Sequence, residues 1–244
     1  MKNHDIYTSS VSSVSLRCVI VANTFYWFLS LIGLYIDFLV VAKRSPFFSR
    51  SKIRPRQYIS GKDRRELILL CAFNMLLVAP LVSVPLYETL WDRIHGSKRL
   101  TDEDEWVWQI EALQKLPIHF LATEVGFYTI HFAMHSWPSL YQHVHKIHHR
   151  FQAPTAMTCV YAHPLEFLVG NLLPIYLGPI ITNAHPLTSY FWFAAAIIGT
   201  CKGHSGYRIF GCADYHDEHH FYYKYIYGGI YVLDFLIGTM KVSS

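Results

Sequence analysis

The stretch His145-Lys-Ile-His148-His149 is the most informative part of this sequence for its fold. The same spacing returns in His216-Asp-Glu-His219-His220, and a related pair, His131-Phe-Ala-Met-His135, precedes both. Histidines three and four positions apart share one face of a helix, one turn apart. Eight histidines in these three histidine boxes exceed the needs of one tetrahedral zinc ion, so the spacing predicts segments that converge on two metal ions.

Further candidate site residues lie between and within the boxes. His204 follows an apolar segment and precedes the last box, which favours ligation. His163 precedes Pro164, so it either ligates a metal or begins a helix with proline in its first turn. Acidic residues near ligands can orient imidazoles through hydrogen bonds. The predicted ligands are His131, His135, His145, His148, His149, His163, His204, His216, His219 and His220, with Glu166 and Asp217 as predicted partners of ligands. The sequence singles out no catalytic residue beyond these ligands.

The composition indicates a membrane protein. Of 244 residues, 52% are hydrophobic and 16% charged, whereas soluble domains carry about 25% charged residues. A spanning helix needs about 20 mostly apolar residues. Five segments approach this length: 18–41, 67–90, 110–130, 163–181 and 186–201. We therefore expect an all-α polytopic membrane protein with about four to five transmembrane or re-entrant helices, whose last two segments form a hairpin that is either re-entrant or fully spanning.

The basic residues predict the orientation. Nine of the 21 Lys and Arg residues lie in the loop 43–65, between two apolar segments. Such a loop is typical of the cytosolic side, and it is too short and too enclosed for a nucleic-acid site. The acidic stretch 91–107 then lies on the other side, and every histidine box returns to the cytosolic side. Because the boxes need one another, we expect one membrane domain over 1–244, with a transmembrane scaffold in 16–130 and a catalytic region in 131–239.

Two other features leave alternatives open. His119 and Glu124 fall inside the third apolar segment, where they either line a cavity or make polar contacts between helices. The aromatic run 221–231 is typical of a belt at the membrane interface.

The ligand type narrows the chemistry. Imidazole suits iron, zinc, copper and nickel, and the boxes contain no thiolate of the kind that holds an iron–sulfur cluster. Two irons held by histidines could activate O2 and break an apolar C–H bond at the membrane edge. A metal transporter would hold its ligands near the bilayer midplane, and a transmembrane b-haem would need histidine pairs inside the spans. The boxes lie between the spans, which favours the oxidase.

The residues between the boxes carry a resemblance. The boxes resemble those of the fatty acid hydroxylase/sterol desaturase superfamily. The sequence around the boxes is similar to that of the C4-methylsterol oxidase (methylsterol monooxygenase) branch. The similar stretches are His145-Lys-Ile-His-His-Arg-Phe-Gln-Ala-Pro154, Tyr161-Ala-His-Pro-Leu-Glu166, His204-Ser-Gly-Tyr207 and Leu233-Asp-Phe-Leu-Ile-Gly-Thr239. The resemblance covers residues 26–239 and departs from that branch at 158–160 and in the short stretch 204–216.

The resemblance implies an enzyme of the endoplasmic reticulum membrane, with two iron ions, O2 as co-substrate and boxes facing the cytosol. The implied reaction is oxidation of the C4-methyl group of a sterol precursor, with fatty-acyl hydroxylation or sterol desaturation as alternatives. The sequence contains no His-Pro-Gly-Gly haem segment. The implied electron source is therefore NAD(P)H through an external cytochrome b5 or its reductase, and the implied substrate is a membrane lipid or sterol.

Overall fold

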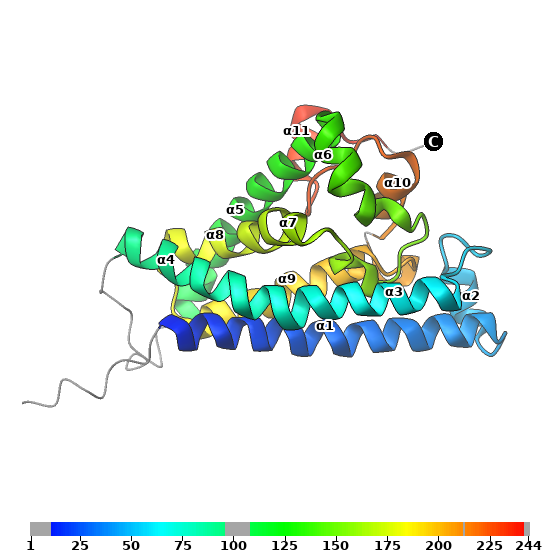
Figure 1. Ribbon diagram of the computed structural model, residues 1–244, viewed down its shortest axis with the longest axis horizontal. Helices are drawn as coiled ribbons and strands as arrows, with labels where there is room; N and C mark the ends of the chain where they lie inside the picture. The colour runs from blue at the N-terminus through cyan, green and yellow to red at the C-terminus, as the bar shows by residue number, and fades with distance from the viewer. Residues whose placement is uncertain (1–10, 96–107, 212, 242–244) are drawn as a thin grey trace, which may run out of the picture.

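The computed structural model describes residues 11–95, 108–211 and 213–241, so residues 96–107 of the predicted lumenal stretch lie outside it (Figure 1). Within the described residues the chain is helical and has no β-strand, with one isolated antiparallel bridge between Lys52 and Tyr207. The all-helical fold predicted from the sequence is confirmed.

Five long helical segments make up the body. They are α1 (Val11–Val41), the continuous run α3 (Gly61–Ala72), η1 (Phe73–Ser83) and α4 (Val84–His95), then α5 (Trp108–Ser136), the run α7 (Pro164–Glu166), η4 (Phe167–Leu172) and α8 (Leu173–Thr182), and α9 (Pro186–Gly203). The short elements are α2 (Pro46–Ser51), α6 (Pro138–His143), η2 (His145–Arg150), η3 (Ala156–Val160), η5 (Arg208–Phe210), α10 (Ala213–Tyr222) and α11 (Val232–Ile237).

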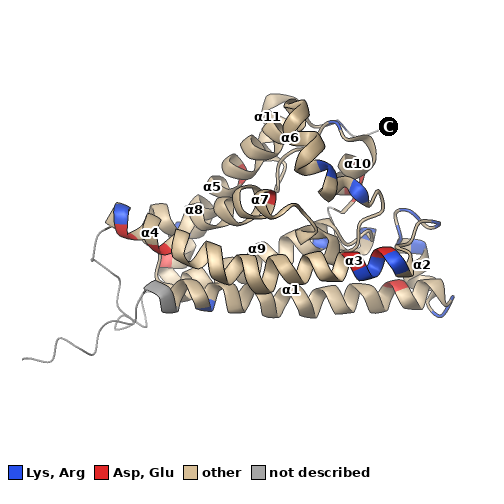
Figure 2. Cartoon of the chain, in the orientation of Figure 1, with Lys and Arg blue, Asp and Glu red and all other residues tan. Residues whose placement is uncertain are grey.

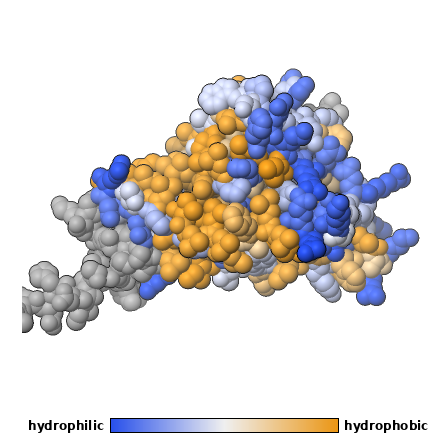
Figure 3. Space-filling view, in the orientation of Figure 1, coloured by the Kyte–Doolittle hydropathy of each residue, from blue (hydrophilic) through white to orange (hydrophobic). Residues whose placement is uncertain are grey.

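Three of the long segments are long and apolar enough to cross a membrane: Val14–Val41, Gly61–His95 and Pro164–Thr182. On α1 the large side chains of Phe28, Leu31 and Tyr35 are exposed, as expected for a surface that meets lipid rather than water. The molecule has an apolar middle and hydrophilic ends (Figure 3). The other two predicted spans form α5 and α9, which carry more polar residues and pack along α8 and α1.

Close helix contacts depend on small residues. At Gly178 of α8, an added Cβ would lie 2.6 Å from the Cα of His119 on α5, so only glycine permits this crossing. The imidazole Nε2 of His119 lies 2.9 Å from the hydroxyl of Thr182. His119 is thus a polar contact between helices, one of the two roles left open by the sequence.

Buried hydrogen bonds hold the segment 157–162, which follows the second histidine box. The side-chain amide of Asn74, on the π-helical η1, donates to the carbonyls of Val160 and Ala162 at 2.9 Å each. The hydroxyl of Tyr26 on α1 donates to the carbonyl of Met157 at 2.8 Å. These bonds satisfy irregular backbone inside the core, where an unpaired carbonyl would be costly.

The basic loop and the histidine boxes meet at the same end of the molecule, as the sequence predicts. The Arg54 guanidinium donates to Asp217, inside the last box, at 2.7 Å. The Arg150 guanidinium, next to the second box, pairs with Asp63 at 2.8 Å. In Figure 2 most positions of charged residues lie toward the two ends of the chain's cartoon, with the loop, α2 and the start of α3 at one of them.

Candidate metal centre

Four elements carry the histidines to one place. His131 and His135 lie in the last two turns of α5, and His204 caps the end of α9. The second box forms the short 3-10 helix η2, and the third lies on α10. All of these side chains are buried except that of His135, which is partly buried.

The imidazoles form two groups, and within each group the potential ligand atoms all lie within 4.8 Å of one another. The five-histidine group contains His131, His135, His145, His149 and His219. The four-histidine group contains His148, His204, His216 and His220. Two adjacent groups of this size match the two metal ions predicted from the spacing.

Each His-x-x-His-His box is divided between the two groups. The outer pair of the second box, His145 and His149, joins the five-histidine group, while His148 joins the other. In the third box the outer pair, His216 and His220, joins the four-histidine group, and the middle histidine crosses over. The spacing therefore lets one short helix contribute imidazoles to both groups, rather than to one group per box.

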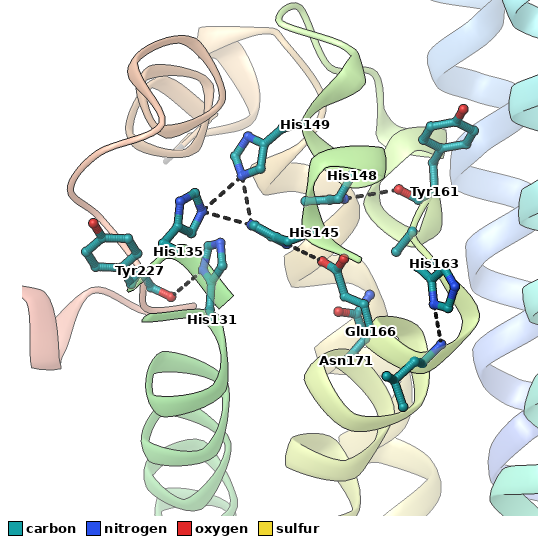
Figure 4. A network of polar contacts seen from close by, with 12 residues as sticks. His131, His135, His145, His148, His149, Tyr161, His163, Glu166, Asn171 and Tyr227 are labelled. Atoms are coloured by element: carbon teal, nitrogen blue, oxygen red, sulfur yellow. Dashed lines mark hydrogen bonds and ion pairs between the residues drawn. The ribbon is translucent and has the colours of Figure 1, made fainter. Parts of the chain in front are cut away.

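The ring nitrogens point at one another in each group. In the five-histidine group, the Nε2 of His135 lies 2.8 Å from that of His145 and 3.1 Å from that of His149 (Figure 4). In the four-histidine group, the Nε2 atoms of His204 and His216 are 2.8 Å apart.

The hydrogen bonds made by Nδ1, the opposite ring nitrogen, indicate which nitrogen of these imidazoles carries the proton. The Nδ1–H of His131 donates to the carbonyl of Tyr227 at 2.8 Å, and the Nδ1–H of His145 donates to the Glu166 carboxylate at 2.6 Å (Figure 4). The equivalent bonds join His219 to Tyr225 O, His148 to Tyr161 O and His204 to Thr200 O. A neutral imidazole that donates from Nδ1 carries a lone pair on Nε2. Lone pairs that converge without a hydrogen between them need a cation, so this donor set fits metal ions.

Burial keeps these imidazoles neutral. Loss of hydration lowers the pKa of His148 to about 4. Burial, with a smaller contribution from His148, lowers the pKa of His204 to about 3. Neutral imidazole is the form that ligates a metal, so the site is prepared for a metal at neutral pH.

A family model confirms the superfamily resemblance. The model described as fatty acid hydroxylase matches residues 116–239, the half of the chain that contains both histidine groups. The chain belongs to the fatty acid hydroxylase family. No solved structure matches the chain.

Named members of the family are similar over most of this chain. "Fatty acid hydroxylase ahd1" of Mycosarcoma maydis is 32% identical over 81% of this chain and 51% of its own length. "Fatty acid hydroxylase domain-containing protein 2" of Homo sapiens is 32% identical over 88% of this chain and 63% of its own length. "Methylsterol monooxygenase 2-2" of Arabidopsis thaliana is 29% identical over 83% of this chain and 78% of its own length. The chain thus spans only part of the first two relatives, and members of the family include oxidative lipid enzymes.

Nine of the ten histidines predicted as ligands enter the two groups, and His163 does not. The side chain of His163 caps α7, where its Nδ1 accepts from the backbone N–H of Leu165 at 3.2 Å (Figure 4). This is the helix-starting role that the sequence left open, because a proline at the first helical position favours a cap just before it. We therefore leave His163 out of the ligand set.

The two predicted acidic partners have different positions. Glu166 contacts a ligand imidazole, that of His145, as expected. Asp217 instead accepts from Arg54, and the cation of Arg54 lies 3.9 Å from the ring centre of Phe221. Burial raises the pKa of Asp217 to about 6, although the neighbouring guanidinium lowers it. Asp217 ties α10 to the basic loop rather than to an imidazole.

No pattern in the sequence points to the backbone acceptors of the imidazoles. The predicted aromatic belt, 221–231, supplies the carbonyls of Tyr225 and Tyr227 to His219 and His131. Glu124, for which the sequence left two roles open, accepts from the backbone of Gly229 and Ile230. A side chain that meets backbone far along the sequence leaves no periodic signal, so pattern analysis could not have found it.

A small pocket lies against both groups. Its lining includes His131 and His145 of the five-histidine group and His148 and His204 of the four-histidine group. The rest of its wall combines apolar or small residues with polar ones. The former are Phe127, Met134, Cys159 and Gly170, and the latter are Glu166, Asn171 and Thr200. An apolar group that entered this pocket would lie next to both sets of imidazoles.

Proposed function

We propose that the protein is an O2-dependent, non-haem di-iron oxidoreductase of the endoplasmic reticulum membrane that oxidises a C–H bond of a membrane lipid. One observation carries this proposal: nine buried imidazoles form two adjacent groups whose Nε2 atoms converge. In five of them the Nδ1–H is held outward.

Iron is the metal that suits an all-imidazole site when the substrate is an unactivated C–H bond, because it supplies the activation of O2 that no side chain can provide. His131, His135, His145, His149 and His219 would hold one ion, and His148, His204, His216 and His220 the other. The acceptors behind the imidazoles fix the ring orientations. The apolar side chains of Phe127 and Met134 keep water away from a lipid carbon in the pocket.

For the substrate we propose stepwise oxidation of the C4-methyl group of a sterol precursor. The text around Tyr161 and His204 and the likeness to a methylsterol monooxygenase over most of its length support this. Fatty-acyl hydroxylation is the second candidate, because the name of the Mycosarcoma maydis relative is that of a fatty acid hydroxylase. Sterol desaturation is the third reaction of the superfamily.

The proposed orientation places the basic loop and the histidine groups on the cytosolic side. Electrons from NAD(P)H would then arrive through a separate cytochrome b5 or its reductase. The ion pair between Arg54 and Asp217 supports the placement of the basic loop and the histidine groups on one side, since it joins the loop to the last histidine box.

Metal analysis and a microsomal assay test the proposal together. Purified protein should hold two irons per chain and show no haem absorbance. Microsomes that contain it should convert a 4-methylsterol to its hydroxymethyl or carboxyl product when given NAD(P)H and O2. Hydroxylation of a fatty-acyl lipid with sterols unchanged would move the substrate to the second candidate. Iron-free protein that carries metal ions across vesicle membranes would replace the oxidase by a transporter.

A further inference from the structure

The segment 223–231, which supplies carbonyls to His131 and His219, has an unusual backbone. Four of its non-glycine residues have positive φ angles: Tyr223 (58°), Tyr225 (66°), Ile226 (60°) and Tyr231 (66°). Side chains with a Cβ rarely adopt this left-handed region, and a β-branched residue such as isoleucine adopts it least readily. Such a backbone persists only where its surroundings hold it.

Two buried carboxylates hold this segment. The Oε2 atom of Glu124 accepts from the backbone N–H groups of Gly229 and Ile230 at 2.8 Å each. The two carboxylate oxygens of Asp234 accept from the N–H groups of Tyr227 at 2.7 Å and Gly228 at 2.6 Å. Glu124 is 1% exposed and Asp234 is fully buried, so these bonds form away from water, where they are strong.

Gly228 allows the two carboxylates to approach. A Cβ at this position would collide with the Oε1 of Glu124 and lie 2.8 Å from the Oδ2 of Asp234. Glycine thus leaves room for both acid groups on one turn of backbone.

The held segment contacts only one of the two histidine groups through its carbonyls. Tyr227 O accepts from His131 and Tyr225 O accepts from His219, and both imidazoles belong to the five-histidine group. In the four-histidine group, His148 and His204 are held instead by the carbonyls of Tyr161 and Thr200, on other segments.

We propose that Glu124 and Asp234 are positioning residues of the five-histidine group. They act through the strained segment 223–231, whose carbonyls set the orientation of His131 and His219. This inference rests on the proposed function, because it treats the imidazoles as metal ligands. It assigns the two carboxylates to one metal position and not to the other.

The test compares Glu124→Gln and Asp234→Asn with Glu111→Gln in the full-length protein. Glu111 is a matched control because it lies on the same helix, α5, and its carboxylate contacts Lys115 and the backbone of His185 instead. A glutamine or asparagine keeps the shape but turns an NH2 group toward a backbone donor. Two quantities are measured: iron per chain after dialysis against a weak chelator, and amide hydrogen exchange of 223–239 in metal-free protein.

We expect the wild type and Glu111→Gln to retain two irons per chain. Glu124→Gln and Asp234→Asn should each retain about one. Loss of a partner that orients a ligand typically weakens metal affinity about 10–100-fold, which the chelator converts into loss of one ion. In metal-free Glu124→Gln, exchange at Gly229 and Ile230 should rise at least about tenfold, as expected when a buried hydrogen bond opens. In metal-free Asp234→Asn the same rise should appear at Tyr227 and Gly228.

The outcomes separate this inference from the proposed function. Iron retained at two per chain in both variants, with fast exchange, would make the carboxylates structural only and overturn the positioning role. Amide exchange that is unchanged from the wild type would show that the two carboxylates do not hold the segment 223–231. Loss of both irons would overturn the assignment to one group. A wild type without iron would contradict the proposed function, while the exchange data would still decide whether the carboxylates hold the segment.

Discussion

The different roles of His145 and His163 follow from the partner of Nδ1 in each ring. His145 and His163 both lie near the start of α7, yet the Nδ1–H of His145 donates to Glu166 while the Nδ1 of His163 accepts from a backbone amide. Donation from Nδ1 turns the Nε2 lone pair of His145 into its group. Acceptance at Nδ1 uses the lone pair of His163 for a helix cap, which explains why the same residue type has two roles.

This difference predicts the effect of single histidine changes. His148→Ala should remove one ligand of the four-histidine group, and His219→Ala one of the other group. Each should lower bound iron and reduce lipid oxidation by at least about 100-fold, because the neighbouring imidazoles then lack a complete coordination set. Iron and product are measured in purified protein. His163→Ala is the control and should keep its iron. Full iron in both ligand variants, or its loss in His163→Ala, would contradict the ligand set.

Glu166 should tune the affinity of the five-histidine group. In Glu166→Gln the acceptor for His145 becomes a neutral amide, and a neutral partner is about half as strong as a carboxylate. We expect iron affinity to fall about 10-fold, measured by competition with a chelator. Asp214→Asn, which removes an exposed partner of Arg208, should leave the affinity unchanged. Equal affinities in Glu166→Gln and wild type would remove Glu166 from the site.

At the scale of elements, helix positions followed from the sequence more fully than the roles of single residues. The five apolar segments became five long helical segments because length and hydropathy act locally along the chain. The division of each box between two groups did not follow. It depends on η2 and α10 lying between the two histidine groups, a tertiary arrangement that i, i+3 and i+4 spacing leaves open. The held segment 223–231 was missed for the same reason, since Glu124 meets it across the fold.

The contact between α5 and α8 predicts a stability effect at one glycine. Gly178→Ala places a methyl group against the backbone of His119, and overpacking of this kind costs about 1–3 kcal/mol. The free energy of unfolding in detergent should fall by that amount. Gly199→Ala on α9 has open space at its Cβ and should be neutral or up to about 1 kcal/mol more stable, because alanine favours helix. An equal effect at the two positions would mean that the helices do not approach as described.

At the scale of the whole molecule, the apolar middle and polar ends define how the protein lies in a bilayer (Figure 3). The basic loop lies at the same end of the molecule as the histidine groups. The excess of Lys and Arg in this loop therefore predicts the membrane side on which both lie.

The proposed topology predicts the outcome of glycosylation mapping. An acceptor sequon introduced at Asp104 should be modified in the lumen, and one introduced at Lys146 should not. The measurement is a mobility shift that a glycosidase reverses, with a sequon at Arg56 as the cytosolic control. Modification at Lys146 and Arg56 but not at Asp104 would reverse the orientation and remove the argument for a cytosolic electron donor.

The division of the boxes has a consequence for biosynthesis. Because α10 supplies His219 to one group and His216 and His220 to the other, neither group has its full set until α10 has left the ribosome. A nascent chain that has inserted α1 through α9 would have only His148 and His204 of the four-histidine group. With the proposed ligand set, that group could hold its ion only after α10 has folded against η2, so the di-iron centre would be completed after the membrane helices have inserted.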